Sequence, residues 1–259
     1  MPAGTSGLAR QHRAGQLRLR ARFLQEFSSA WSVLNPRSLD TTGPIWLAMV
    51  LPLIVRFRNE SASGGVAFYN AIRQTRTGQL VSPPVPRIDW SPADSAAQVS
   101  MRVLGPVQIK SLTHRHPDLP AEKLRTAHVS AAAGATRHVL DGARTATVAA
   151  AGEDELAVGF ARYASGTACA FCKMLAGRGA VYKSERTAQF TSGGQRYHDG
   201  CVCLPVPVFS HTDPLPPGGD DYARLWAETT AGLTGKAARN AFRRAVEGHT
   251  DPTGAAAAR

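Results

Sequence analysis

All four cysteines of this 259-residue chain fall in one window, from Cys169 to Cys203, and this clustering is the strongest constraint on the fold. The window opens with Cys169-Ala-Phe-Cys172 and closes with His198-Asp-Gly-Cys201-Val-Cys203. Thiolates and imidazoles bind borderline metals such as zinc, which takes four such ligands in a tetrahedron. A Cys-x-x-Cys turn offers two sulfurs to one ion, and the His-x-x-Cys-x-Cys segment can supply the other ligands. The pattern therefore predicts one zinc ion that closes the window into a small module.

Five side chains compete for the four places in this predicted zinc site. One set consists of the four cysteines, and another keeps the first pair and combines the histidine with only one of the last two cysteines. Either set would leave zinc fully coordinated by protein, without an open position for water or substrate, so we expect a structural metal. The candidate ligands are Cys169, Cys172, His198, Cys201 and Cys203.

Other interpretations of the cysteines stay open at this point. Two disulfides would suit a secreted chain, but the N-terminus is polar and basic and lacks the apolar segment of a signal peptide. A thioredoxin-like redox pair would need a βαβ context, and it leaves the second Cys-x-Cys without a role. Four unrelated reduced thiols are the simplest alternative.

The net charge points to an acidic partner. The formal value of +11 comes largely from arginine and suits nucleic acid, an anionic membrane face or an acidic protein surface. The longest apolar run, Ile45 to Val55, is too short to span a bilayer, so we expect a soluble, cytoplasm-made protein that has no membrane contact.

The sequence lacks the usual signatures of catalysis. It contains no phosphate-binding glycine loop and no deaminase motif, so we predict no catalytic residue, no organic cofactor and no small-molecule substrate. A zinc-supported nuclease or other DNA-processing enzyme is the alternative, because nucleases of the ββα-metal type often carry structural zinc and His198 could supply their histidine.

The chain as a whole is predicted to be mainly α, with a small zinc-stabilised α+β module near the C-terminal side. Four regions follow from composition and periodicity. They are an N-terminal helical region over residues 1–118 with a proline-rich connector at 82–92, one long helix in 119–156, the Cys/His module in 157–210, and a linker, C-terminal helix and disordered tail over 211–259.

Within these regions, apolar spacing predicts the individual elements. A turn is expected at Ser63-Gly64-Gly65, and a kink or helix end at Gly105-Pro106. The expected helices cover 8–34, 44–58, 66–77, 93–113, 119–151 and 221–246, and the expected strands cover 158–163, 181–182 and 202–209.

Several motifs of the second half occur in a fixed order. They are Gly142-Ala-Arg-Thr-Ala146, Val158-Gly-Phe-Ala-Arg162, Cys169-Ala-Phe-Cys-Lys-Met-Leu175, Arg178-Gly-Ala-Val-Tyr182, Tyr197-His-Asp-Gly-Cys-Val-Cys203 and Pro207-Val-Phe209. In this order they resemble the MuF-like minor head proteins of tailed bacteriophages, above all those from phages of actinobacteria. The resemblance covers roughly residues 138 to 210.

This resemblance implies a protein of the virion, made in the cytoplasm of the host bacterium and packaged inside the phage head. It implies a part in head morphogenesis or DNA ejection, through binding to the portal, to the major capsid protein or, by way of the basic surface, to packaged DNA. The Cys/His residues would then be metal ligands. Arg144 would brace the module or face an acidic partner, and an ordinary surface arginine is the alternative.

Overall fold

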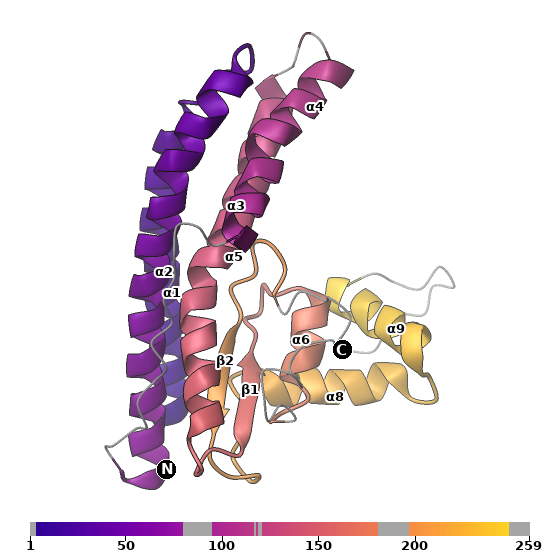
Figure 1. Cartoon of the computed structure of the whole chain (residues 1–259). Coiled ribbons are helices and arrows are strands. Elements are labelled where there is room, and N and C mark those ends of the chain that lie inside the picture. The colour runs from indigo at the N-terminus through magenta and orange to yellow at the C-terminus, as the bar shows by residue number, and fades with distance from the viewer. Residues whose placement is uncertain (1–3, 80–94, 117, 119–120, 181–196, 249–259) are drawn as a thin grey trace.

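The computed structural model describes residues 4–79, 95–116, 118, 121–180 and 197–248. These residues form an elongated helical bundle, and a small sheet with short helices packs against one half of it (Figure 1). The predicted class, mainly α with a small β-containing module towards the C-terminal side, is confirmed.

The bundle is built from long helices that run up and down along one axis. Helices α1 (Gly4–Trp31), α2 (Leu39–Thr77) and α5 (Ala121–Glu153) pack on one another over most of their length. In the upper half of Figure 1 a fourth rod lies beside α5. It consists of α3 (Ser95–Arg102), the π-helical turn η1 (Val103–Val107) and α4 (Gln108–Arg115). The disturbance expected at Gly105-Pro106 is therefore a π-helical turn, and the rod continues beyond it.

The main core lies between α1, α2 and α5. Aromatic side chains from α1 and α2 meet there, including Phe23, Phe27 and Trp46, all fully buried. The facing side of α5 contributes alanines such as Ala131 and Ala135, whose small side chains let the helices approach closely.

The turn predicted at Ser63-Gly64-Gly65 is wrong, because α2 is one continuous helix of 39 residues. Gly65 lies against α5, where an added Cβ atom would come within 2.6 Å of the carbonyl oxygen of Ala143. Gly142 has the same role from the other side, since its Cβ would lie 2.1 Å from the carbonyl oxygen of Arg58. These glycines thus allow close contact between two helix backbones.

The apolar run from Ile45 to Val55 is by itself too short to span a bilayer, but it is only part of the 39-residue helix α2. The length of the run therefore no longer excludes a membrane-crossing helix. By length and composition alone, α2 meets the criteria for a membrane-crossing helix, which the core helix of a soluble protein can also meet. Here it packs along α1 and α5. The Nε of its buried Arg58 donates a hydrogen bond to the carbonyl oxygen of His138, 2.6 Å away on α5. In this fold α2 is therefore a bundle helix.

The sheet consists of β1 (Gly159–Tyr163) and β2 (Leu204–Val208), which confirms two of the predicted strands. They pair antiparallel, from Gly159 opposite Val208 to Tyr163 opposite Leu204. The sheet packs against the lower half of α5 in Figure 1, below the end of the fourth rod. It thereby brings the residues just before β2 next to α5.

The last helix is divided in two, contrary to the single helix expected over 221–246. Helices α8 (Gly219–Thr230) and α9 (Gly235–Glu247) form a hairpin, and Gly232 has a φ of 71° in the turn between them. Their aromatic residues Trp226 and Phe242 pack on each other, with ring centroids 5.3 Å apart. The predicted connector at 82–92, the strand at 181–182 and the tail after 248 lie outside the described residues.

Candidate metal-binding site

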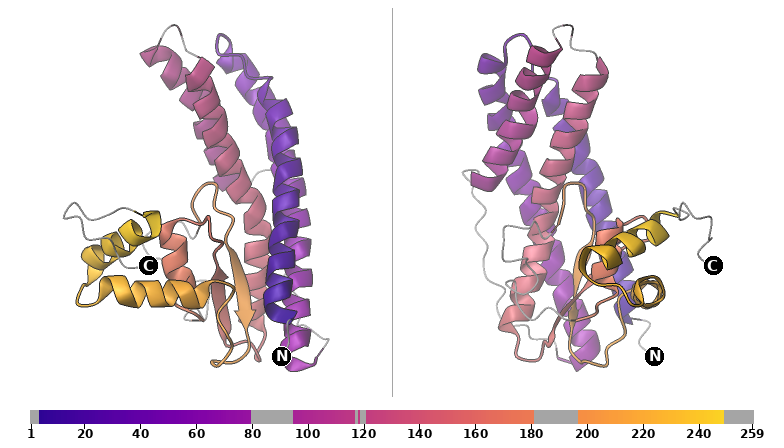
Figure 2. Two further views of the ribbon diagram at one scale, coloured as in Figure 1. Left: turned by 180° about the vertical axis from the view of Figure 1, so that it is seen from behind. Right: turned by 90° about the vertical axis from the view of Figure 1, so that its right-hand side faces the viewer.

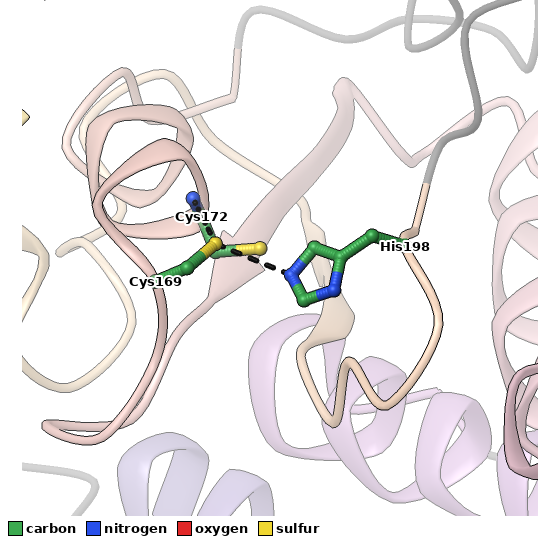
Figure 3. Close-up of side chains that lie close together, drawn as sticks. All are labelled: Cys169, Cys172 and His198. Carbon is green, nitrogen blue, oxygen red and sulfur yellow. Dashed lines mark hydrogen bonds between the residues drawn. The ribbon is translucent and has the colours of Figure 1, made fainter. Parts of the chain in front are cut away.

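The first cysteine pair lies at the start of helix α6 (Ala170–Ala176). Cys169 is the N-cap residue, and its sulfur accepts a hydrogen bond from the backbone N–H of Cys172 at 3.5 Å. One turn of helix thus places both side chains on the same side of the chain, as Figure 3 shows. Their sulfurs face the loop that carries His198.

The second group lies in the segment that leads into β2. Gly200 adopts a φ of 77°, and the N–H of Cys201 donates to the carbonyl oxygen of His198 at 3.0 Å. This tight turn, which favours glycine, brings the histidine ring and the Cys201 sulfur to the same side. Cys203 follows immediately before the strand and is buried.

The two segments bring all five predicted ligands together. The Sγ of Cys169 lies 3.2 Å from Nε2 of His198, and the Sγ atoms of Cys172 and Cys201 lie 3.6 Å apart. None of the four cysteines forms a disulfide. Two sulfurs bound to one tetrahedral zinc are separated by about 3.8 Å, the value expected from Zn–S bonds of about 2.3 Å. The observed spacing therefore fits a shared metal ion.

The ligand atoms form two overlapping groups of three. Cys169, Cys172 and His198 make one group, and Cys172, Cys201 and Cys203 make the other, with the atoms of each group within 4.8 Å of one another. Cys172 belongs to both groups, so it lies at the centre of the cluster. These Cys/His groups can hold a metal ion.

The histidine ring is oriented as metal-ligating imidazoles usually are. Its Nδ1 lies 2.9 Å from the carbonyl oxygen of Asp199, which can only accept a hydrogen bond. The proton therefore resides on Nδ1, and Nε2 faces the sulfur of Cys169. Hydrogen bonding of the second ring nitrogen to a carbonyl is how proteins fix the tautomer of a metal-bound histidine.

Close packing of the sulfurs lowers the pKa of two of the four thiols. The pKa of Cys169 is lowered to about 5, first by the side-chain hydrogen bond from Cys172 and then by the backbone N–H of Cys172 and by His198, against the opposing effect of burial. The pKa of Cys201 is lowered to about 2, through hydrogen bonds from Cys172 and Cys203 and through the charge of Arg144. Contacts of Cys172 with the neighbouring sulfurs, followed by burial, raise the pKa of Cys172. Thiolates and thiols thus share protons that a divalent cation could replace.

Helix α5 is the platform on which the second group rests. Arg144, only 3% exposed, donates from Nε to the carbonyl oxygen of Cys203 at 3.1 Å and from Nη2 to that of Cys201 at 2.6 Å. Arg137 donates to Asp199 at 2.7 Å. Arg144 is therefore buried, unlike an ordinary surface arginine, and its hydrogen bonds are those of a brace.

A second buried arginine lies beside the cluster, on strand β1. Nη1 of Arg162 is 3.6 Å from the sulfur of Cys172, and its guanidinium lies 4.2 Å from the ring centroid of Tyr197. The guanidinium of Arg144 lies 3.8 Å from the same ring. The two cations can offset the negative charge that three or four thiolates would bring to a divalent metal.

Sequence reasoning assigned no role to Arg137, Arg162 or Tyr197. The signal for Arg162 was its place in line with Val158 and Phe160 on one side of the expected strand, and the structure shows that strand buried at every position. Tyr197 adjoins His198, but nothing local indicates that two arginines from distant elements contact its ring.

Fold and site together define a class: a mainly helical protein in which a small sheet module carries a Cys/His cluster able to hold a metal ion. The chain belongs to a family of viral proteins described as VG15 protein, whose family model matches residues 5–229. This match is consistent with a phage protein and suggests a virion-related product made in the host. No curated protein and no solved structure matches the chain.

Proposed function

We propose that this VG15 family member is a minor head protein of MuF-like type from a tailed phage, carried inside the head and stabilised by one structural zinc ion. It would act in head morphogenesis or DNA ejection by binding the portal, the major capsid protein or packaged DNA. The observation that carries the proposal is that Cys169, Cys172, His198, Cys201 and Cys203 form two adjoining groups of ligand atoms that share the sulfur of Cys172. These residues belong to two of the ordered motifs that carry the likeness to the MuF-like proteins.

The donor set supports zinc as the metal. Thiolates and an imidazole are the ligands that zinc prefers, whereas magnesium and calcium prefer oxygen. Four of the five candidates would fill a tetrahedron. Cys172 belongs to both groups of ligand atoms, and both ligand sets considered from the sequence include it.

The surroundings of the cluster support a structural role. The His198 ring is engaged between Cys169 and the backbone of Asp199, and the Asp199 carboxylate pairs with Arg137. A nuclease would need these side chains to face a metal-bound water or the DNA. In our proposal the ion instead fixes the loop and α6 to the bundle, and the chain acts by binding.

Protein identification in purified virions tests this function. Mass spectrometry of particles washed at high salt should detect the chain together with the portal, and protease treatment of intact particles should leave it uncut. Its absence from particles that contain portal and capsid protein would contradict the proposal.

A cleavage assay tests the enzymatic alternative. Purified protein incubated with plasmid DNA and magnesium or manganese should leave the DNA intact. Cleavage by the wild type that is lost in His198→Ala would favour the nuclease.

A further inference from the structure

Helix α9 presents a row of cations to solvent. Its exposed basic residues recur on one side of the helix, and Glu247, the single acidic residue in Gly235–Glu247, pairs with one of them, Arg243, at 3.1 Å. The hairpin projects away from the bundle, so this row lies at the periphery of the molecule (Figure 2). The cations are Lys236, Arg239, Arg243 and Arg244.

The opposite side of α9 packs against α6 and α8. Phe242 is 1% exposed and packs with Trp226 of α8 and with Met174 and Leu175 of α6. Ala238 is buried as well. An amphipathic helix that binds a membrane must insert its apolar side among the lipids. This helix can offer a partner only its charged side, which favours a hydrophilic polyanion over a lipid surface.

The spacing of the cations matches a nucleic-acid backbone. Arg244 lies eight positions after Lys236, so the row is about 12 Å long at 1.5 Å per residue. One strand of duplex DNA places a phosphate every ~3.4 Å along its axis, so such a row lies opposite three or four phosphates. The row carries four positive charges and one negative, a net charge of +3 (4 − 1).

We infer that the solvent-facing side of α9 is a nucleic-acid contact that binds the phosphate backbone without regard to sequence. It lies beyond residues 5–229, the part matched by the family model, so it is a feature of this chain in addition to the family's shared region. The inference takes DNA as partner from the proposed function. The shape and charge of α9 provide the contact.

Counterion release sets the size of the expected effect. Each phosphate neutralised contributes a slope of about −0.9 to the plot of log affinity against log salt concentration. Three effective contacts therefore give about −2.7, or a roughly 40-fold loss of affinity between ~50 and ~200 mM salt. At ~0.1 M salt, removal of three contacts should weaken binding on the order of 100-fold.

Fluorescence anisotropy with a labelled random-sequence duplex of about 30 base pairs tests the inference on the full chain. The test variant is Arg239→Gln/Arg243→Gln/Arg244→Gln. The control, Arg18→Gln/Arg115→Gln/Arg125→Gln, removes the same charge from exposed positions on α1, α4 and α5. We expect the α9 variant to lose about 100-fold in affinity and about 2.7 in salt slope, and the control to change affinity by less than about threefold. Circular dichroism checks that both variants are folded.

Three results would overturn the inference: no DNA binding by the wild type at ~50 mM salt, equal losses in the two variants, or binding to vesicles of anionic lipid that exceeds binding to DNA. The outcome is independent of the virion test. A chain found in particles that fails to bind DNA refutes only the α9 contact, and a DNA-binding chain that is absent from particles refutes only the proposed function.

Discussion

Replacement of Arg144 by methionine tests whether α5 holds the metal-binding loop in place. Methionine has a similar length and fills much of the same space, but it donates no hydrogen bond. The carbonyl oxygens of Cys201 and Cys203 would lose a buried, charged donor at 2.6 and 3.1 Å. The ring of Tyr197 would lose one of its two cation contacts and keep the one with Arg162.

The expected cost follows from these contacts. A hydrogen bond to a charged group contributes about 1.5–3 kcal/mol, and a buried acceptor without a partner adds a desolvation penalty. The two contacts overlap, and the other partner of Arg144, Asp141, is partly solvated, so we expect Arg144→Met to lower the free energy of unfolding by about 3–4 kcal/mol. Arg144→Lys, which keeps the charge and can reach one carbonyl, should lose about half as much.

Urea unfolding followed by circular dichroism measures these differences. The matched control is Arg224→Met on α8, where the side chain is 66% exposed and pairs with Asp221 at the surface, so its loss should cost less than about 0.5 kcal/mol. If Arg144 served mainly to meet an acidic partner, the isolated chain would be indifferent to its replacement. A stability of Arg144→Met within about 0.5 kcal/mol of wild type would refute the brace.

Two further predictions concern helix packing and pH. Gly142→Ala should destabilise the fold by about 2–3 kcal/mol, because its Cβ would lie 2.1 Å from a backbone oxygen of α2. Gly152→Ala, in the same helix with open space around it, should stabilise the fold by about 0.5–1 kcal/mol. Shifts of the melting temperature in the same direction for Gly142→Ala and Gly152→Ala would contradict this prediction. Burial lowers the pKa of His12, stacked on Phe68, to about 4. As the pH falls, His12 is protonated in the unfolded chain before it is protonated in the folded chain. The free energy of unfolding should therefore fall on the order of 2 kcal/mol as pH drops from ~6.5 towards ~4. His12→Phe should reduce this dependence in urea titrations, and an unchanged pH profile would count against it.

The helices, strands and ligand group that the sequence predicted correctly are those that depend on the spacing of residues along the chain. Apolar periodicity located most of the helices, and alternation located both strands of the sheet. The Cys/His window predicted a group that the fold does bring together. These signals are local, since each comes from a few neighbouring residues and a known chemistry.

Contacts between distant segments carried no such signal. Gly64-Gly65 has the composition of a turn, and only the approach of α5 shows that the glycine at 65 serves close helix packing. The same limit applies to buried charge. Asp154, buried at the end of α5, accepts hydrogen bonds from Tyr69 and Arg73 of α2, at 2.7 and 2.6 Å, and its partners lie more than eighty residues away.

Metal analysis of the purified chain tests the central claim most directly. Elemental analysis should find one zinc ion per wild-type chain, and Cys172→Ser should bind none, because its sulfur belongs to both ligand groups. Both ligand sets include Cys169, so Cys169→Ser should lose the zinc as well, whereas Cys203→Ser should keep it only if His198 and Cys201 complete the tetrahedron. A wild-type chain without bound metal after purification in zinc-supplemented buffer, or a Cys172→Ser variant with full zinc content, would contradict the account.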